Sequence, residues 1–182
     1  MQKRRVFIAL AAVAGLAGWY LFRPERVFID ATVNERFPSD QIARSDSGGG
    51  AAGVLATGQF HGVAHDAKGT ATVHQLADGK RVLRLTDFET SNGPDVQVYL
   101  VAAPDARDNA TVTNAGFVHV APLKGNIGNQ NYDLPANVDL ATYRAVTIWC
   151  RRFGVNFATA PLLTTTPLAA ATEDLERVAR MR

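Results

Sequence analysis

Apolar and polar residues alternate along the middle of the chain, in short runs that turn residues separate. Alternation with a period of two is typical of strands that bury one face. The runs that fit this pattern are LATGQFHGVA, TATVHQL, KRVLRLTDF, DVQVYLV, FVHVAPL, QNYDL, RAVTIWC and VNFATAPL. Eight short strands within roughly 110 residues predict an all-β fold, an antiparallel β-sandwich or barrel that is jelly-roll-like or immunoglobulin-like in general architecture.

A different pattern opens the chain. Three basic residues at positions 3–5 precede an uncharged apolar run over positions 6–22. The run is at the short end of what crosses a bilayer, and Trp19 and Tyr20 fit as interface anchors at its far side. A small-x-small cleavage site after the run is missing, which favours a retained signal-anchor over a cleaved signal peptide. We therefore expect a transmembrane helix within residues 1–22, a cytoplasmic N-terminus and a β domain in the periplasm or outside the cell.

These patterns divide the chain into four segments. We expect a membrane anchor over 1–22, a juxtamembrane segment with a Gly/Ser linker over 23–52, a β domain over 53–163, and a C-terminal tail or short helix over 164–182. Within the juxtamembrane segment, RVFIDATVNERF has the apolar spacing of a short helix that ends before Pro38. The following PSDQIARSDSGGGAAG reads as a polar linker.

Composition narrows the classes of function. The chain has 182 residues, of which 47% are hydrophobic and 20% charged, so a packed core is expected and general disorder is excluded. The net charge is only +2 and three basic residues lie at the N-terminus, which leaves no basic surface stripe for nucleic acid. One cysteine excludes an internal disulfide and a Cys-Cys metal site. A serine-hydrolase motif of the Gly-x-Ser-x-Gly type is not found in the sequence.

The single cysteine, Cys150, ends the RAVTIWC run. Ile148 and Cys150 share one strand face, while Thr147 and Trp149 share the other, so Cys150 is expected to point into the core. The arginines at positions 151–152 would favour the thiolate if the sulfur is open to solvent. A sealed sulfur would be inert, as in most free cysteines. A reactive thiol and a small buried hydrophobe both remain open as interpretations.

The histidines are the other candidate ligands. They are His61, His65, His74 and His119, and the first two share a face if their strand is unbroken. A histidine together with Cys150 has the donor types of a haem or metal site. For each histidine taken singly, a polar residue on a strand face is the simpler interpretation.

Three stretches of the chain together resemble a known family. LRLTDFETSNGPDVQVYL, LKGNIGNQNYDLP and VTIWCRRFGVNFATAPL, in this order, resemble the DM-thirteen domain, an extracellular module often found with DOMON domains. His65, followed by Gly-Thr-Ala at positions 69–71, resembles the opening pattern of that family. The resemblance runs from about Gly53 to Leu163, and the expected anchor is similar to bacterial members with one domain behind a membrane anchor.

The resemblance implies a β-rich domain that acts in electron transfer or oxidative modification at the cell surface, rather than a conventional enzyme. The characteristic cysteine of the family falls on Cys150, as a bare thiol or as a ligand to haem or a metal, and His65 is the second candidate for cofactor binding. A lone thiol cannot complete a disulfide cycle by itself, so a haem or a cysteine of a redox partner protein is expected. The alternative is a non-catalytic cell-surface binding or adhesion module in which Cys150 is structural.

Overall fold

The computed structural model describes residues 2–22, 29–38 and 53–165. Its first element is helix α1 (Gln2–Phe22), so a helix at the N-terminus is confirmed. Among the helices of these described ranges, α1 included, none is long and apolar enough to cross a membrane, and the predicted transmembrane anchor is not borne out. Because residues 2–5 are polar or charged, the uncharged part of α1 is only about 25 Å long, against about 30 Å of bilayer hydrocarbon.

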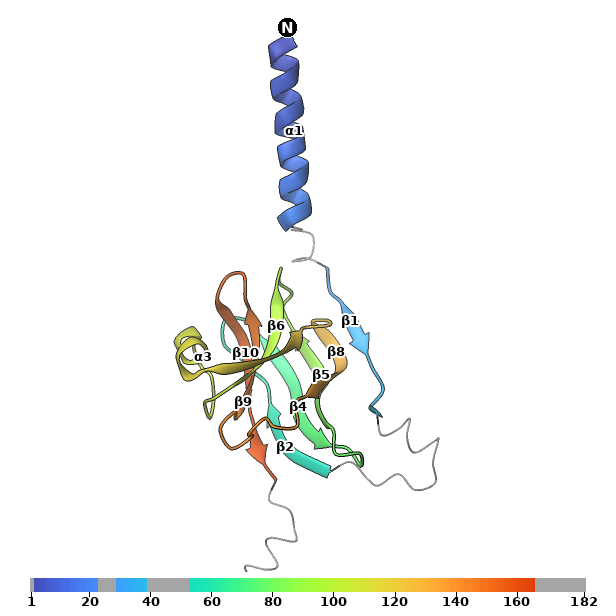
Figure 1. Ribbon diagram of the computed structural model, residues 1–182, viewed down its shortest axis with the longest axis vertical. Helices are drawn as coiled ribbons and strands as arrows, with labels where there is room; N and C mark the ends of the chain where they lie inside the picture. The colour runs from blue at the N-terminus through green and yellow to red at the C-terminus, as the bar shows by residue number, and fades with distance from the viewer. Residues whose placement is uncertain (1, 23–28, 39–52, 166–182) are drawn as a thin grey trace, which may run out of the picture.

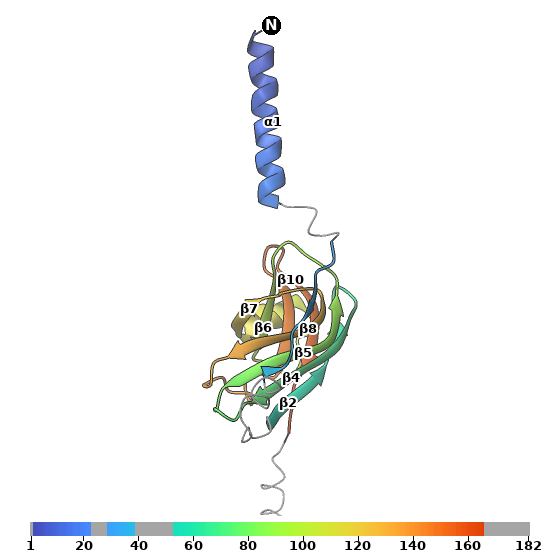
Figure 2. The same cartoon turned by 90° about the vertical axis from the view of Figure 1, so that its right-hand side faces the viewer.

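Most of the remaining described chain forms two β-sheets packed face to face (Figures 1 and 2). The six-stranded sheet has the order β1 (Thr32–Asn34), β8 (Ile127–Leu134), β5 (Arg81–Thr90), β4 (Ala67–Gln75), β2 (Gly53–Gln59) and β11 (Leu163–Thr164). The five-stranded sheet has the order β3 (His61–Gly62), β10 (Val155–Pro161), β9 (Ala145–Cys150), β6 (Val96–Val101) and β7 (Phe117–Pro122). Neighbouring strands are antiparallel except β1 and β8. The all-β prediction is confirmed, as a sandwich rather than a barrel.

Each of the eight predicted runs contains a strand, but the first run is divided. It breaks at Phe60, which is buried; β2 before it lies in the six-stranded sheet and β3 after it in the five-stranded sheet. Since β3 ends at Gly62, His61 and His65 do not share one unbroken strand. The expectation that they share a face therefore fails.

The main core lies between the two sheets. Leu83 and Leu85 of β5 face Ile148 and Cys150 of β9 within one apolar cluster, and all four are 0% exposed. Burying each large aliphatic side chain of this kind stabilises the fold by about 1.5–3 kcal/mol. The apolar residues of the alternating pattern therefore lie on the inner faces of the two sheets.

A smaller apolar cluster covers the outer face of the five-stranded sheet. Tyr99 of β6 and Trp149 of β9 pack there with Val112 of helix α3 (Asn109–Ala115). The Asp108 side chain caps α3 by accepting a hydrogen bond from the amide of Thr111 at 2.6 Å. No pattern in the sequence predicts this helix. Its packing on the outer face of the sheet explains why β9 is buried on both faces.

Residues 29–38, which we call the strap, run along the outer edge of the six-stranded sheet (Figure 1). The prediction of a short helix here is wrong, because the strap contains β1, which pairs with β8 in parallel. Asn34 lies opposite Asn129 in this pairing, and the amide of Glu35 donates to the carbonyl of Asn129 at 2.8 Å. The β-branched Val33 suits an extended backbone. The contacts that decide the conformation lie about 95 positions away, beyond the reach of a local pattern.

Two predicted segments fall wholly or largely outside the described residues. The linker over 39–52 lies outside them, as does the tail or helix after Thr165. The part of the tail that is described extends the sheet: β11 pairs with β2, and the amide of Thr165 donates to the carbonyl of Leu55 at 2.9 Å.

Candidate functional site

Cys150 is the last residue of β9 and is completely buried, with 0% of its surface exposed. Across the sheet it lies opposite Val96, the first residue of β6, and Val155, the first residue of β10. It belongs to the same apolar cluster as Ile148 and Phe157. The predicted orientation of the Cys150 side chain into the core is confirmed.

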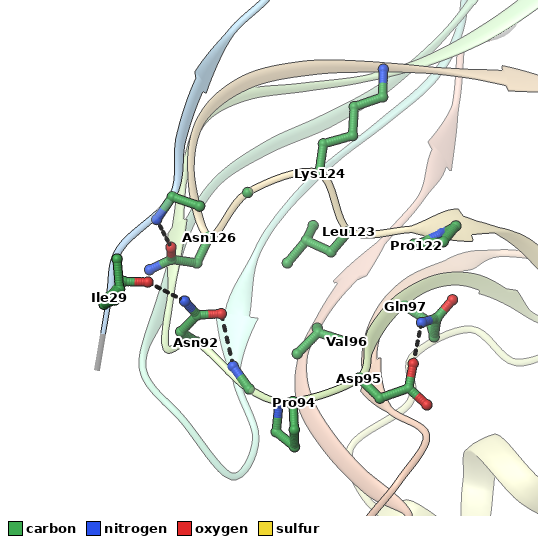
Figure 3. A pocket seen from close by; sticks show the side chains of 13 residues that line it. Ile29, Asn92, Pro94, Asp95, Val96, Gln97, Pro122, Leu123, Lys124 and Asn126 are labelled. Carbon is green, nitrogen blue, oxygen red and sulfur yellow. Dashed lines mark hydrogen bonds between the residues drawn. The ribbon is translucent and has the colours of Figure 1, made fainter. Parts of the chain in front are cut away.

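Several loops meet where β9 ends and β6 begins. We call this region the Cys150 end; it consists of residues 63–66, 91–95 and 123–126 with the beginning of the strap. A cavity of about 520 Å³ lies between the strap, the 91–95 loop and the 123–126 loop (Figure 3). A second, shallower one of about 460 Å³ lies beside residues 63–66. The Cys150 end is thus hollowed at the surface, while the thiol lies beneath it.

The amide side chains that line the larger cavity are paired with the strap. Asn92 donates from Nδ2 to the carbonyl of Ile29 (Figure 3). Asn126, which is only 2% exposed, accepts at Oδ1 from the amide of Ala31 at 2.7 Å and donates from Nδ2 to Asp30 at 2.8 Å. Because the Asn92 and Asn126 side chains already bind the strap, they are not free to bind a ligand. The cavity is therefore the space at the contact between the strap and two loops.

Asp95 connects the 91–95 loop to the residue after Cys150. Arg151 donates from Nε to Oδ2 of Asp95 at 2.9 Å, and its backbone amide donates to the Asp95 carbonyl at 2.9 Å. The hydrogen bond to Asp95 raises the pKa of Arg151. Gln97 donates to the other carboxylate oxygen at 2.7 Å. The Arg151 guanidinium, expected from the sequence to favour the thiolate, is therefore engaged with a carboxylate.

His65 lies at the same end of the sandwich, half-buried against an aromatic ring. The ring centroids of His65 and Phe157 are 4.0 Å apart, at an interplanar angle of 51°. Since Phe157 belongs to the apolar cluster of Cys150, the contact between His65 and that cluster runs through a phenyl ring. His61 points elsewhere, with Nε2 3.1 Å from the carboxylate of Asp105. The structure thus brings His65, but not His61, to the Cys150 end.

The packing around Cys150 does not fit a haem or metal ligand. A ligand sulfur needs an open side where the iron or metal can bind, and this sulfur is sealed between Val96 and Val155 in the core. Within residues 2–22, 29–38 and 53–165, no group of three or more His, Cys, Asp or Glu side chains could hold a metal ion. A cofactor on the sulfur would require the ends of β6 and β10 to separate.

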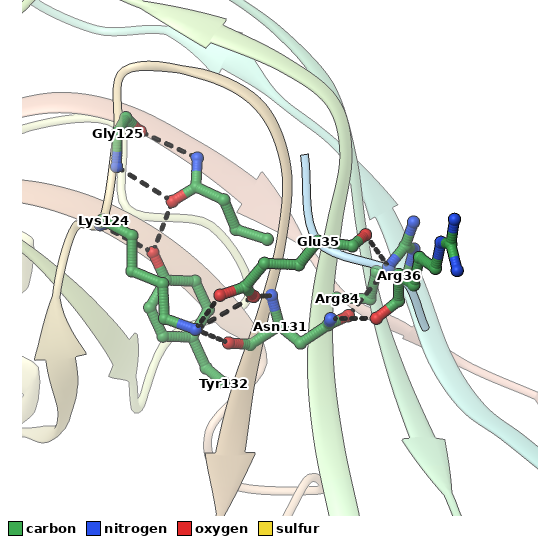
Figure 4. Close-up of polar contacts among 8 residues, drawn as sticks. Glu35, Arg36, Arg84, Lys124, Gly125, Asn131 and Tyr132 are labelled. Carbon is green, nitrogen blue, oxygen red and sulfur yellow. Dashed lines mark hydrogen bonds and ion pairs between the residues drawn. The ribbon is translucent and has the colours of Figure 1, made fainter. Parts of the chain in front are cut away.

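Glu35 in the strap is the centre of a polar network at the edge of β8 (Figure 4). Lys124 donates from Nζ to its two carboxylate oxygens at 2.7 and 2.9 Å, and the amide of Asn131 donates to Oε2 at 2.8 Å. Arg84 donates to the side chain of Asn131 at 2.8 Å. Burial works to raise the pKa of Glu35, but the hydrogen bonds from Lys124 and Asn131 and the charges of Lys124 and Arg84 outweigh it, and the pKa is lowered.

Buried polar groups fix the 123–126 loop from the inside. Gln130, 0% exposed, donates from Nε2 to the carbonyl of Gly125 at 2.7 Å and accepts from its amide at 3.2 Å. Tyr132 donates its hydroxyl proton to Gln130 at 2.7 Å and accepts from the amide of Lys124 at 3.1 Å. Burial raises the pKa of Tyr132, so it remains a neutral donor. In the sequence this stretch has only the pattern of a glycine-rich turn, and its two Gly-Asn pairs, at positions 125–126 and 128–129, are the available signal of a close backbone contact.

Residues 59–162, more than half of the chain, match the family described as Electron transfer DM13. The chain belongs to this family. No curated protein and no solved structure matches it. The resemblance drawn from the sequence is therefore confirmed at the level of the family. The DM13 segment begins at the end of β2 and leaves the strap outside it.

The fold brings the three sequence blocks of the DM13 segment together. The 91–95 loop belongs to the first block, the 123–126 loop to the second, and Cys150 to the third, and all three lie at the Cys150 end. DM13 is an electron-transfer-associated domain, which is consistent with a redox role for this chain.

Proposed function

We propose that the chain is a redox module and that the thiol of Cys150 exchanges electrons with cysteines of a partner protein. The observation that carries this is the place of the single cysteine, at the end of the sandwich where the three blocks of an electron-transfer family meet. Because the chain contains one cysteine, any disulfide it forms must join it to another molecule.

The packing favours the bare thiol over the cofactor ligand, since the sulfur has no open side. Its reaction then depends on a local opening of the Cys150 end, because a sulfur that is 0% exposed cannot meet a partner's disulfide. Local openings of this kind occur in folded proteins at free energies well below global unfolding.

In the proposed step, the Cys150 thiol loses its proton to solvent and the thiolate attacks one sulfur of a partner disulfide. A bond forms between the two sulfurs, the partner disulfide breaks, and its other sulfur leaves as a thiolate. A thiol of a second, reduced protein then attacks the partner's sulfur in the mixed disulfide. Cys150 leaves as a thiolate and regains a proton. A second thiolate of the reduced protein then attacks that protein's own sulfur in the new mixed disulfide, and the partner's remaining sulfur leaves as a thiolate. Two electrons have then passed from two thiols of the reduced protein to the original disulfide.

The test is mixed-disulfide formation with oxidised glutathione as probe, on the folded full chain, followed by intact mass. We expect one glutathione adduct on Cys150, removed by dithiothreitol, and none in Cys150→Ser. The double variant Cys150→Ser, Ser91→Cys carries one cysteine in an exposed position of the 91–95 loop and serves as the control for an ordinary surface thiol. If the control reacts while wild type reacts only in urea concentrations that unfold it, the redox role of Cys150 is wrong.

A second candidate function is a non-catalytic binding module in which Cys150 only packs. The complete burial of Cys150 in apolar surroundings favours it. In that case Cys150→Ala changes the free energy of unfolding and leaves the binding of the folded chain to its partner unchanged. A redox equilibrium with glutathione that Cys150→Ala abolishes would decide against this candidate.

The β domain acts, in this proposal, outside the cytoplasm. The support is the sequence itself: basic residues at positions 3–5 followed by the uncharged run over 6–22, the pattern of an export signal. A fusion of alkaline phosphatase after Arg182, expressed in a bacterial host, should be active, and deletion of residues 6–22 should abolish that activity. An inactive full-length fusion would place the domain in the cytoplasm.

A further inference from the structure

We propose that the strap is a latch over the redox thiol: bound along β8, it holds the loops of the Cys150 end closed, and its release gives a partner access to Cys150. This deepens the proposed function, on which the redox meaning of the latch rests. Its first test, however, measures only whether the sulfur can be reached.

The strap reaches two of the three loops of the Cys150 end, those over 91–95 and 123–126. Its carbonyl at Ile29 accepts from Asn92 of the 91–95 loop, and its backbone and Asp30 side chain bind Asn126 of the 123–126 loop. Further along, Glu35 holds Lys124, the residue two positions before Asn126. One extended segment thus ties together two loops that precede strands of different sheets, β6 and β8.

The tied loops lead directly to the residues around the thiol. Leu123, next to Lys124, packs against the apolar cluster that contains Cys150. The amide of Leu123 donates to the carbonyl of Val96 at 3.0 Å, and Val96 lies opposite Cys150 in the sheet. A movement of the 123–126 loop therefore loosens Leu123 and Val96, which close the core at this end.

The edge of β8 is shaped for the strap. A Cβ atom at Gly125 would lie 2.3 Å from the carbonyl oxygen of Ala31, and one at Gly128 would lie 2.2 Å from that of Val33. Both are far below van der Waals contact, so the backbone of the strap fits there because these two positions lack side chains. The close fit indicates that the edge of β8 is adapted to bind the strap.

The attachment is nevertheless easier to open than the core. β1 has three residues, two of them exposed. The strap around it is held by hydrogen bonds, by the partly exposed ion pair of Glu35, and by one half-buried ring, Phe37, whose centroid lies 4.5 Å from that of His74. Edge segments held in this way open at lower free energy than strands buried on both faces. The latch therefore can open while β6, β9 and β10 remain paired everywhere except at their ends around Val96 and Cys150.

The experiment is the rate of N-ethylmaleimide labelling of the full chain under native conditions, in which Cys150 is the only thiol. Glu35→Lys places a cation against Lys124 and Arg84 and should release the strap, raising the labelling rate by about tenfold or more. The matched control Asp78→Lys makes the same change of charge in an exposed turn where Asp78 pairs with Lys80, and should label at the wild-type rate. Asp30→Ala, which removes one contact with Asn126, should give a smaller increase.

The control for global unfolding is the free energy of unfolding of each variant, measured in urea. Detachment of the strap is followed by hydrogen exchange at the amides of Glu35 and Ile127, which bond across the β1–β8 pairing. The latch is wrong if these amides lose protection from exchange and the labelling rate does not change. It is also wrong if the increase in labelling rate is no larger than the increase in the globally unfolded fraction, calculated from the free energy of unfolding. If labelling rises as expected but glutathione exchange is absent, the latch stands and the redox role of Cys150 fails.

Discussion

The core around Cys150 and the strap are held in place by opposite kinds of contact. Around Cys150 the side chains are apolar and mostly buried, and neighbouring strands pair along most of their length. The strap is held by amide side chains, a carboxylate, backbone groups and the ring of Phe37, along an edge that is only partly buried. Most of this apolar packing is lost only when the sandwich unfolds, whereas the hydrogen bonds of the strap exchange more readily with water. The difference indicates a rigid site whose accessibility is decided by a segment outside the DM13 match.

A substitution inside the core should have the largest effect on stability. Ile148→Ala removes a side chain that is 0% exposed and should lower the free energy of unfolding by about 2–5 kcal/mol, because neighbouring strands cannot collapse into the space. Leu163→Ala, at a residue 73% exposed in β11, should change it by less than about 0.5 kcal/mol. Urea titration of both variants gives the values. Similar losses in both would mean that the two-sheet core does not dominate stability.

The next largest effect should come from filling the space that the strap occupies. Gly128→Ala puts a Cβ against the Val33 carbonyl at a position whose φ is +104°, and should cost about 2–3 kcal/mol and detach the strap. Gly79→Ala is the matched control, since its φ is +84° but no atom lies within 4 Å of the added Cβ. It should cost only about 1 kcal/mol, from backbone strain alone. Equal costs for the two variants would show that the strap does not press on β8.

These two regions also differ in how far the sequence predicts them. The strands around Ile148 were predicted because alternation directly encodes which side chains face a core, and the inward side of Cys150 followed from the same rule. The spacing of apolar residues within the strap predicts a helix, because such a pattern reports only on residues close together in the sequence. The pairing that makes part of the strap a strand is with β8, far along the chain. The sequence does not predict helix α3, because the helix has only seven residues. The outward-facing residues of β9, on which it packs, do not indicate by themselves that a helix covers them.

The candidate site was only partly within reach of the sequence. Cys150 and His65 were named, and the structure places both at one end of the sandwich. Glu35 and Asn126 were not named, because a carboxylate and an amide in polar loops look like any surface residue until the fold brings them together. The seal over the sulfur depends on the same long-range contacts, so the sequence left open whether the thiol is exposed.

Substitutions of Cys150 test how apolar the surroundings of its side chain are. Cys150→Ala should cost about 1–2 kcal/mol of unfolding free energy for the lost sulfur contacts. Cys150→Ser is closer in shape but buries a hydroxyl among aliphatic side chains, and should cost about 1 kcal/mol more than alanine. Thermal and urea unfolding of the two variants measure the difference. A serine variant as stable as wild type would mean that a polar partner or water reaches this position.

The smallest effect should appear at the strap, as a dependence on pH. The folded-state pKa of Glu35 lies below its ordinary value of 4.5, so the ionised carboxylate stabilises the folded chain at any pH above that value, and the contribution is lost as pH falls through the lowered folded-state pKa. Because the side chain is one-third exposed, we expect about 1 kcal/mol or less between wild type and Glu35→Gln at neutral pH. That difference should shrink once pH drops below 4.5. Urea unfolding of both proteins across this range, with maleimide labelling of Cys150 on the same samples, tests whether protonating Glu35 also opens the path to the thiol. A difference in stability that grows as the pH falls would show that the carboxylate is not held by Lys124 and Arg84 in the folded state.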